Sequence, residues 1–310
     1  MAAGIQTQVN VVPAPAVEGD FASSNPRVSM LEGPGGFVAG ASGVTVGRFA
    51  WASNQFMDAD NAPAVLNNFG AGPVTGFIHR GQQGLNTTFL AGSSMLIPAG
   101  FGVGDCFTGG DFWAKNNGTI QALPGMKAYA NTLTGAVSFA ATGTAGTTSL
   151  TTSSIAAGTT IAATGSISGN VLTITAISAG TIYPGTIITG TNIATGTQVV
   201  SQLSGTPQGI GTYSLSIGEQ TIVSEAIAGT YGVLTVGAGT PISGGVLSGS
   251  GVTPGTVVFG QLTPTTWVVS PSQTAASTTI AEATSVETKW IARSGGLVGE
   301  LVKISDQPLG

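Results

Sequence analysis

The sequence predicts an all-β protein with three parts: a small β-barrel or β-sandwich base domain, an inserted β-rich repeat domain and an extended N-terminal arm. Glycine occupies 49 of the 310 positions and separates short segments rich in β-branched and aromatic residues, which are typical of strands. Several of these segments alternate apolar and polar residues with the period of two that strands have. Only residues 62–69 favour a turn or two of helix. A hydrophobic fraction of 42% is enough for a packed core.

The charge content restricts the function. Charged residues make up 7% of the chain, against roughly 25% in an ordinary soluble domain. The net charge is −5, with eight Lys and Arg in total and no basic cluster, which argues against binding to a nucleic-acid backbone. So few charges favour a protein whose surface packs against other proteins. A neutral β-domain coated with Ser and Thr, stable by itself, remains an alternative.

The arm is predicted to span residues 1–26. Pro13 and Pro15 block helix and favour extended backbone before them. Residues 5–11 alternate as a strand does, and a strand this short needs a sheet edge, which a neighbouring subunit could supply. A frayed terminus is the alternative. Residues 1–17 contain no Lys or Arg and no sustained apolar run, so we expect neither an export signal nor a membrane span, and assembly in a cytoplasm.

The base domain is predicted to combine residues 27–139 with residues 286–310. The first range holds most of the aromatic residues, and Asn117-Gly118 is a strong turn signal within it. The second range regains the mixed charge of the first, so its strands are expected to return and close the same domain. The strands predicted in the two ranges are residues 43–51, 87–90, 94–97, 110–115, 286–293 and 300–305.

Residues 140–285 are predicted to form the inserted domain, with two repeats at about 165–223 and 229–281. Between Ala128 and Thr288 there is no Lys or Arg. Three segments recur in the same order, at offsets of 62, 59 and 54 residues, which indicates a duplicated β unit. They are 171–173 with 233–235, 188–197 with 247–256, and 211–216 with 265–270. Low-complexity disorder is the alternative for this tract.

Catalytic and metal-binding signals are missing. Cys106 and His79 are the single cysteine and histidine, so neither an intrachain disulfide nor a multi-Cys or His-pair metal site can form. No Gly-x-Ser-x-Gly elbow surrounds a candidate nucleophile. Asp58 and Asp60 lack the later oxygen ligands of a calcium loop. We therefore predict no enzyme activity, no catalytic or metal-binding residue and no cofactor.

Several segments together resemble the bacteriophage structural cement protein family. They are residues 16–27, 40–51, 76–80, 97–101, 110–116, 288–290 and 299–305. The resemblance implies a virion protein on the outer capsid surface, assembled in the bacterial host cytoplasm. Its partner would be the major capsid protein, and it would form a symmetric homo-oligomer, with a trimer as one option. The central repeats depart from shorter family members and look like β modules of phage fibre and decoration proteins.

The expected capsid or oligomer interface combines exposed aromatic and basic candidates with the apolar residues of the arm. These candidates are Ile5, Val9, Val11, Phe21, Arg27, Arg48, Trp51, His79, Arg80 and Trp113. The alternative function is a phage fibre or adhesin that binds a receptor or glycan, and the inserted domain could bind a host-surface glycan. A carbohydrate-active enzyme and a bacterial surface-layer protein are further alternatives. No membrane partner is expected.

Overall fold

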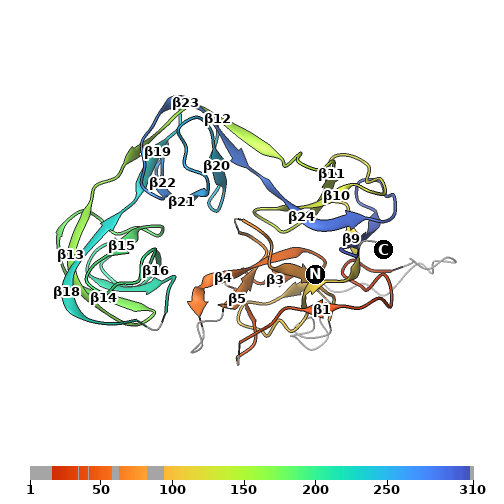
Figure 1. Ribbon diagram of the computed structural model, residues 1–310, viewed down its shortest axis with the longest axis horizontal. Coiled ribbons are helices and arrows are strands. Elements are labelled where there is room, and N and C mark those ends of the chain that lie inside the picture. Colours follow the sequence, from red (N-terminus) through yellow and green to blue (C-terminus); the bar gives the residue numbers. More distant parts are fainter. Residues whose placement is uncertain are drawn as a thin grey trace, which may run out of the picture. The chain divides into compact units, whose positions relative to one another are not determined.

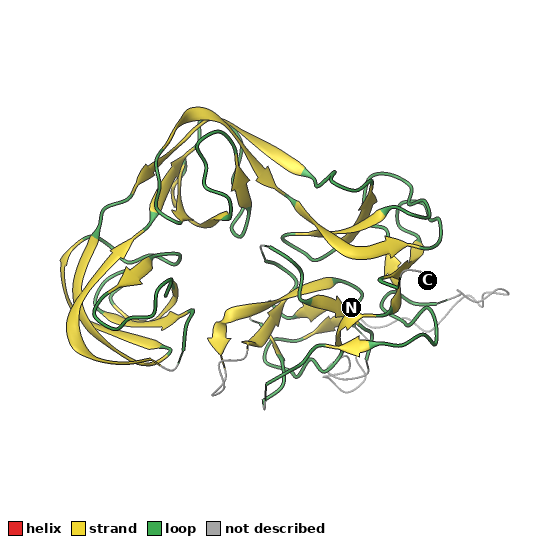
Figure 2. Ribbon diagram, viewed as in Figure 1, coloured by secondary structure: helices red, strands yellow, loops and turns green. Residues whose placement is uncertain are grey.

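A computed structural model describes residues 16–33, 35–40, 42–57, 63–70, 72–81, 94–218 and 220–307. The regular structure in these ranges consists of strands alone (Figure 2), which confirms the all-β prediction. Contacts divide the chain into two compact units. Unit 1 comprises Met1–Ala52, Leu66–Ala145 and Ser285–Gly310, and unit 2 comprises Ser53–Val65 and Gly146–Thr284.

Three sheets lie wholly or mainly in unit 1, and several of their strands are labelled in Figure 1. The first has six strands in the order β1 (Val28–Ser29), β8 (Cys106–Gly109), β6 (Gly76–Ile78), β4 (Phe49–Met57), β5 (Pro63–Asn67) and β2 (Val38–Ala39). The second has five strands in the order β11 (Val137–Ala140), β10 (Lys127–Asn131), β24 (Ser285–Ala292), β25 (Leu301–Ser305) and β9 (Asp111–Lys115). The third pairs β3 (Val44–Thr45) with β7 (Leu96–Ile97).

The two larger sheets of unit 1 pack together as a β-sandwich with an aromatic core. Phe49 lies with its ring centroid 5.3 Å from that of Trp290, and Phe77 lies 4.9 Å from Phe112. All four side chains are buried. Aromatic pairs at such separations add to the free energy of burial, so these contacts across the sandwich fix the sheets against each other.

Most strand predictions in unit 1 are confirmed, whereas the one prediction of helix is wrong. Residues 110–115, 286–293 and 300–305 form β9, β24 and β25 within a residue of the expected ends. Residues 43–51 divide into β3 and β4, because Gly47 adopts a positive φ of 76° in the turn between them. Residues 87–90 lie outside the described residues.

The helical turn predicted near residues 62–69 is wrong, because this segment contains β5. Leu66 is fully buried there, and its carbonyl accepts a hydrogen bond from the Gly40 amide at 2.9 Å. A buried position between neighbouring strands outweighs the weak local preference for helix.

Unit 2 contains two six-stranded sheets, of which one is a closed barrel and the other a half-barrel (Figure 1). We name the closed one the outer barrel: β12 (Thr147–Ala157), β19 (Gly232–Thr235), β22 (Thr266–Ser270), β21 (Thr256–Thr263), β20 (Val246–Ser248) and β23 (Ala275–Ala283). The other is the inner barrel: β15 (Ile187–Thr189), β18 (Gln220–Thr230), β13 (Ile161–Gly169), β14 (Val171–Ala179), β17 (Gly211–Leu215) and β16 (Val199–Gly205).

In the sequence, the inner barrel is inserted between the first and second strands of the outer one. Along the chain, β12 of the outer barrel comes first, the six inner strands β13 to β18 follow, and β19 to β23 of the outer barrel come last. Between β15 and β16 the inner sheet is joined by hydrogen bonds from the Val199 amide to the Thr186 carbonyl and from the Gly185 amide to the Val199 carbonyl, both 2.8 Å. The outer barrel has the same pair of bonds, from Val258 to Gly245 and from Gly244 to Val258.

The two barrels share their strand register as well as their order. Leu172 pairs with Tyr213 in the inner barrel, and Leu234 pairs with Trp267 in the outer barrel. These are the residues that the repeated sequence segments place in correspondence, and all four are buried. Ile167 opposite Leu172 likewise corresponds to Ile155 opposite Leu234. The first strand of the second copy is therefore β12, which precedes the first copy in the sequence.

Both barrels close one turn with a glutamine side chain. In the inner barrel, Gln220 Oε1 accepts a hydrogen bond from the Ala194 amide at 2.8 Å, and its Nε2 donates to Thr197 Oγ1 at 3.2 Å. In the outer barrel, Gln273 makes the same two bonds, with the Thr253 amide at 2.7 Å and with Thr256 Oγ1 at 2.5 Å. Each glutamine thus satisfies buried polar groups that the turn alone leaves unpaired.

Glu282 occupies a place that threonine fills in the other copy. In the inner barrel, the Tyr183 amide donates to Thr186 Oγ1 at 3.3 Å. In the outer barrel, the corresponding Ile242 amide donates to Glu282 Oε1 at 2.8 Å, and Gly245 stands where Thr186 would be. A Cβ on Gly245 would lie 1.9 Å from Glu282 Oε1, so the small residue makes room for the carboxyl group.

We predict that Glu282→Gln stabilises the protein at neutral pH. Glu282 is 0% exposed, its Oε2 has no hydrogen-bond partner, and burial raises its pKa above the usual 4.5. The charged form is therefore disfavoured in the folded state, and the stability of the native chain falls as pH rises through that raised pKa. The free energy of unfolding of Glu282→Gln minus that of the native chain should grow between pH 4 and pH 8 in urea titrations. A difference that does not change with pH would contradict this account.

Candidate interaction surface

The described N-terminal segment extends the five-stranded sheet of unit 1. The Gly19 amide donates to the Trp113 carbonyl at 2.7 Å, the Trp113 amide donates to the Asp20 carbonyl at 2.8 Å, and the Ala22 amide donates to the Asp111 carbonyl at 2.9 Å. Residues 19–22 therefore lie beside β9 as an added strand. The edge of β9 is covered by the chain's own backbone at this point.

Three predicted interface residues, Phe21, His79 and Arg27, form a stack at this edge. The imidazole of His79 lies parallel to the Phe21 ring, with the centroids 3.7 Å apart and the planes at 16°. The Arg27 guanidinium carbon also lies 3.7 Å from the Phe21 centroid, so it must occupy the opposite face of that ring. Cation–π contact of this kind holds an arginine in place while part of its guanidinium stays available. Arg27 itself is exposed.

A buried carboxylate anchors the segment that carries this stack. Asp111 Oδ2 accepts hydrogen bonds from Ser23 Oγ and Asn25 Nδ2, both at 2.6 Å. Burial alone would raise the pKa of Asp111, but the bonds from Ser23, Ser305 and Asn25, with the charge of Arg293, bring it below the usual 3.8. Asp111 therefore stays ionised and ties residues 23–25 to β9.

Two of the remaining predicted residues, Arg80 and Trp113, bond through their backbones to residues 19–20 at the same edge. Trp51 is 5% exposed in the sandwich core and donates its indole N–H to the Gly72 carbonyl at 3.0 Å, so we leave it out of the surface. Arg48 Nη1 donates to the Thr134 carbonyl at 3.2 Å. The Arg80 amide donates to the Gly19 carbonyl. Trp113 is half-buried, with Lys303 Nζ 5.1 Å from its ring. Ile5, Val9 and Val11 lie outside the described residues.

Charge is distributed unevenly between the two units. All eight Lys and Arg of the chain belong to unit 1, which also has eight Asp and Glu, whereas unit 2 has five acidic residues and no cation. Basic side chains that could pair with an acidic partner are therefore found in unit 1 alone. The stack of Arg27, Phe21 and His79 lies in this unit, as does Asp105, whose Oδ1 lies 3.7 Å from His79 Nδ1.

The described residues offer no constellation for catalysis or metal binding. No group of three or more His, Cys, Asp or Glu that could hold a metal ion occurs among them, and none of their segments is a helix able to cross a membrane. Burial raises the pKa of Cys106 to about 12, so its thiol stays protonated. His79, the single histidine of the chain, stacks on Phe21.

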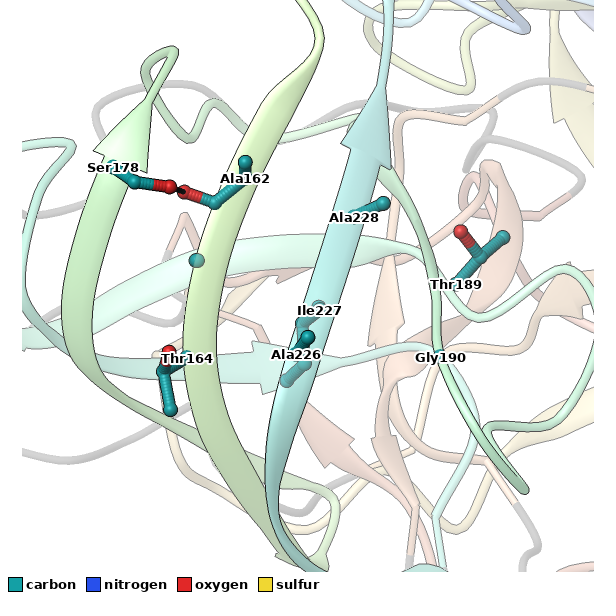
Figure 3. Close-up of a pocket in the computed structure, with 9 residues that line it drawn as sticks. Ala162, Thr164, Ser178, Thr189, Gly190, Ala226, Ile227 and Ala228 are labelled. Atoms are coloured by element: carbon teal, nitrogen blue, oxygen red, sulfur yellow. Dashed lines mark hydrogen bonds between the residues drawn. The ribbon is translucent and has the colours of Figure 1, made fainter.

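Figure 3 shows a depression on the inner barrel with a volume of about 420 Å³. Its lining side chains are small, and Ser178 Oγ, the most polar of them, donates to the Ala162 carbonyl at 3.0 Å. None of the lining residues is charged or aromatic. They are Ala162, Ala163, Thr164, Ser178, Thr189, Gly190, Ala226, Ile227 and Ala228. The polar side-chain groups of the depression are the hydroxyls of Thr164, Ser178 and Thr189.

Sequence reasoning missed the anchor of this surface. Asp111, Ser23 and Asn25 were not among the candidates, and Asp111 was predicted only as part of the strand at residues 110–115. A Ser-x-Asn pair just before Pro26 is a signal for side-chain bonding in a turn. That signal does not reveal a partner 86 or 88 residues away.

We predict that Asp111→Asn lowers the free energy of unfolding by about 1–3 kcal/mol at pH 7, because it weakens charge-assisted hydrogen bonds to a buried group. The folded-state pKa of Asp111 is depressed, so its contribution is present above pH 3.8 and is lost as pH falls further. Urea titrations at pH 7 and pH 3 should show the difference shrinking. Asp105→Asn, at a weak pair, is the matched control and should cost at most about 1 kcal/mol. Equal losses for both variants would refute the anchor.

Comparison with known proteins gives one family. Residues 5–179 match the XM1 gp53 minor capsid protein family, which covers unit 1 up to β11 and continues through β14 of the inner barrel. No curated protein and no solved structure matches the chain. The match spans more than half of the sequence. The chain therefore belongs to the XM1 gp53 minor capsid protein family, and it is a structural component of a phage capsid rather than a catalyst.

Proposed function

We propose that this minor capsid protein is a cement protein, which binds the outer capsid surface through unit 1 and holds neighbouring major capsid proteins together. The observation that carries the proposal is the concentration of every Lys and Arg in unit 1. Basic and aromatic side chains on one unit provide specificity through paired contacts with an acidic or apolar partner surface. The exposed Arg27, held on Phe21, and the half-buried Trp113 are the proposed centre of the contact.

The energetics of such a role require several modest contacts. A specific interface buries roughly 1,000 Å² or more, and only part of the apolar area, at about 25 cal/mol per Å², remains as affinity after entropic costs. A protein that touches two or three capsid subunits gains avidity, because the second contact forms at a high effective concentration. Reinforcement of a shell thus needs no catalytic group. It needs a rigid unit, which the sandwich core of unit 1 supplies.

We also propose that residues 140–285 form an inserted domain that capsid binding does not require. The support is that the ends of unit 2 meet: the Thr284 amide donates to the Gly146 carbonyl at 2.8 Å. On either side, β11 pairs with β10 and β10 pairs with β24, so the sheet of unit 1 continues across the junction. The tandem barrels also suit the alternative function of binding a host-surface glycan.

The cementing role predicts a measurable loss of shell strength. Capsids assembled without this protein should release DNA at a lower temperature than complete capsids, because the bridges between neighbouring subunits are missing. Adding the purified protein back should restore the release temperature, followed by dye access to the packaged DNA. If fully occupied capsids released DNA at the same temperature as capsids without the protein, it would be a capsid protein without a cementing role.

A second prediction concerns the insertion. A chain in which residues 147–283 are replaced by a Gly-Ser-Gly linker should fold, because the linker needs to join only Gly146 to Thr284. It should occupy stripped capsids at the same copy number as the full chain, measured by quantitative gel densitometry. Loss of the folded state would show that unit 1 depends on unit 2. A folded chain with no capsid binding would place the contact on the barrels.

A further inference from the structure

The five-stranded sheet of unit 1 turns one side to the sandwich core and the other side outward. The core side carries the buried residues Ala114, Ala128, Trp290, Ala292 and Val302. Because successive side chains of a strand point to opposite sides of the sheet, the neighbours of these residues point outward. Among these neighbours are five of the chain's eight Lys and Arg, which we name the basic face: Lys115, Lys127, Lys289, Arg293 and Lys303.

Two cations of the basic face are available to a partner. Lys289 Nζ lies 3.0 Å from Asp306 Oδ2, and Lys127 lies near Glu287. By contrast, Arg293 and Lys303 form no ion pair within the described part of the chain. Their charges are therefore not neutralised by a direct carboxylate contact.

Arg293 and Lys303 both line a small pocket on this face. Ala22, Ser23, Asp111 and Ser305 also line it. Lys303 lies opposite Trp113 and Ser305 lies opposite Asp111, while the Arg293 amide donates to the Lys303 carbonyl at 2.7 Å. Side chains opposite each other on neighbouring strands share one side of a sheet. The sheet register thus brings the two cations to the same pocket.

The size of the pocket restricts what can enter it. Its volume is about 130 Å³. A single water needs roughly 10–15 Å³, whereas pockets for drug-sized molecules measure roughly 300–1,000 Å³. The pocket is therefore too large for one water and too small for a sugar chain or a nucleotide. A single amino-acid side chain fits it.

The charge of the pocket selects a carboxylate. Asp111 is 6% exposed and ionised, and its Oδ2 already accepts bonds from Ser23 and Asn25. Against this one negative charge stand Arg293 and Lys303, so the pocket has one positive charge in excess. One carboxylate balances that excess. A phosphate group, with a charge of about −1.5 to −2 at pH 7, would overcompensate it beside Asp111, and a cation would meet two like charges.

Both cations are positioned before a partner arrives. Arg293 Nη2 donates to the Gln307 carbonyl, and a guanidinium has five N–H donors, so others remain for a ligand. Lys303 Nζ lies 5.1 Å from the Trp113 ring, a cation–π contact that limits the freedom of its exposed side chain. Side chains that are already ordered lose less entropy when they bind.

We infer that this pocket receives an Asp or Glu side chain of the major capsid protein, and that the basic face docks on the acidic surface around it. The inference rests on the proposed function for the identity of the partner and deepens it by naming the chemistry of the contact. The pocket adjoins the proposed centre of that contact, because Lys303 lies on Trp113 and Ala22 follows Phe21. Arg27 Cγ lies 3.3 Å from where a Cβ on Gly110 would be, directly before Asp111.

The first experiment tests the pocket without a capsid. The ¹⁵N-labelled full chain is titrated at constant ionic strength with propionate, with its neutral isostere propionamide and with inorganic phosphate, and the side-chain N–H signals of Arg293 are followed by NMR. Propionate should give a saturable shift, and propionamide should give none. Lys303→Gln should weaken propionate binding at least fivefold. The matched control Lys127→Gln removes the same charge from the same face outside the pocket and should change it less than twofold. Equal responses to propionate and propionamide, tighter binding of phosphate, or equal losses in the two variants would overturn the inference.

The second experiment tests the partner. Lys303→Glu should bind stripped capsids at least tenfold more weakly than the native chain, because it places a like charge against the incoming carboxylate, and Lys127→Glu should lose at most threefold. Native capsid affinity of Lys303→Glu would show that the capsid does not use the pocket. Failure of cementing would look different: the native chain would bind capsids through the pocket without raising the temperature of DNA release.

Discussion

The pairing of the C-terminal strands with β9 and β10 is the constraint on which the rest of the chain depends. Val302 lies opposite Ala114 and Ala130 lies opposite Val286, so strands that precede and follow the barrels in the sequence form one sheet. This sheet places Trp290 against Phe49 and completes the sandwich core. The same pairing brings the chain back to the point where the barrels begin. A long insertion can therefore leave and return without opening the core.

The two barrels of unit 2 pack their cores in the same way, with different residues at equivalent positions. The pairs Leu172–Tyr213 and Leu234–Trp267 fill corresponding positions of the two cores, and Gln220 and Gln273 close corresponding turns. Glu282 accepts the backbone hydrogen bond that Thr186 accepts in the other copy, and Gly245 leaves space for its carboxyl group. Strands that pair on both sides leave few free edges for aggregation. A protein with so few charges can thus stay folded without a strongly charged surface.

The sequence predicts the strands of this protein better than it predicts their partners. Alternation of apolar and polar residues identified strands, because that signal is local and reflects burial on one side of a sheet. The local sequence signal gave the wrong conformation near Leu66, because contact with distant strands decides the conformation there. The repeated segments predicted that Tyr213 corresponds to Trp267. They did not predict that β12 belongs to the second copy, because β12 precedes the first copy in the sequence. Of the surface, Phe21, Arg27 and His79 were predicted, whereas the bonds of Asp111 to residues far away in sequence were not.

We propose that this capsid protein works by adhesion through unit 1, which contains the cations and the stacked Arg27. A cryo-EM reconstruction of the intact particle tests this claim most directly, because it shows which unit meets the shell and how many subunits each copy touches. The account predicts density on the outer surface, with unit 1 against at least two major capsid proteins. Density inside the shell, or contact made by the barrels alone, would contradict it.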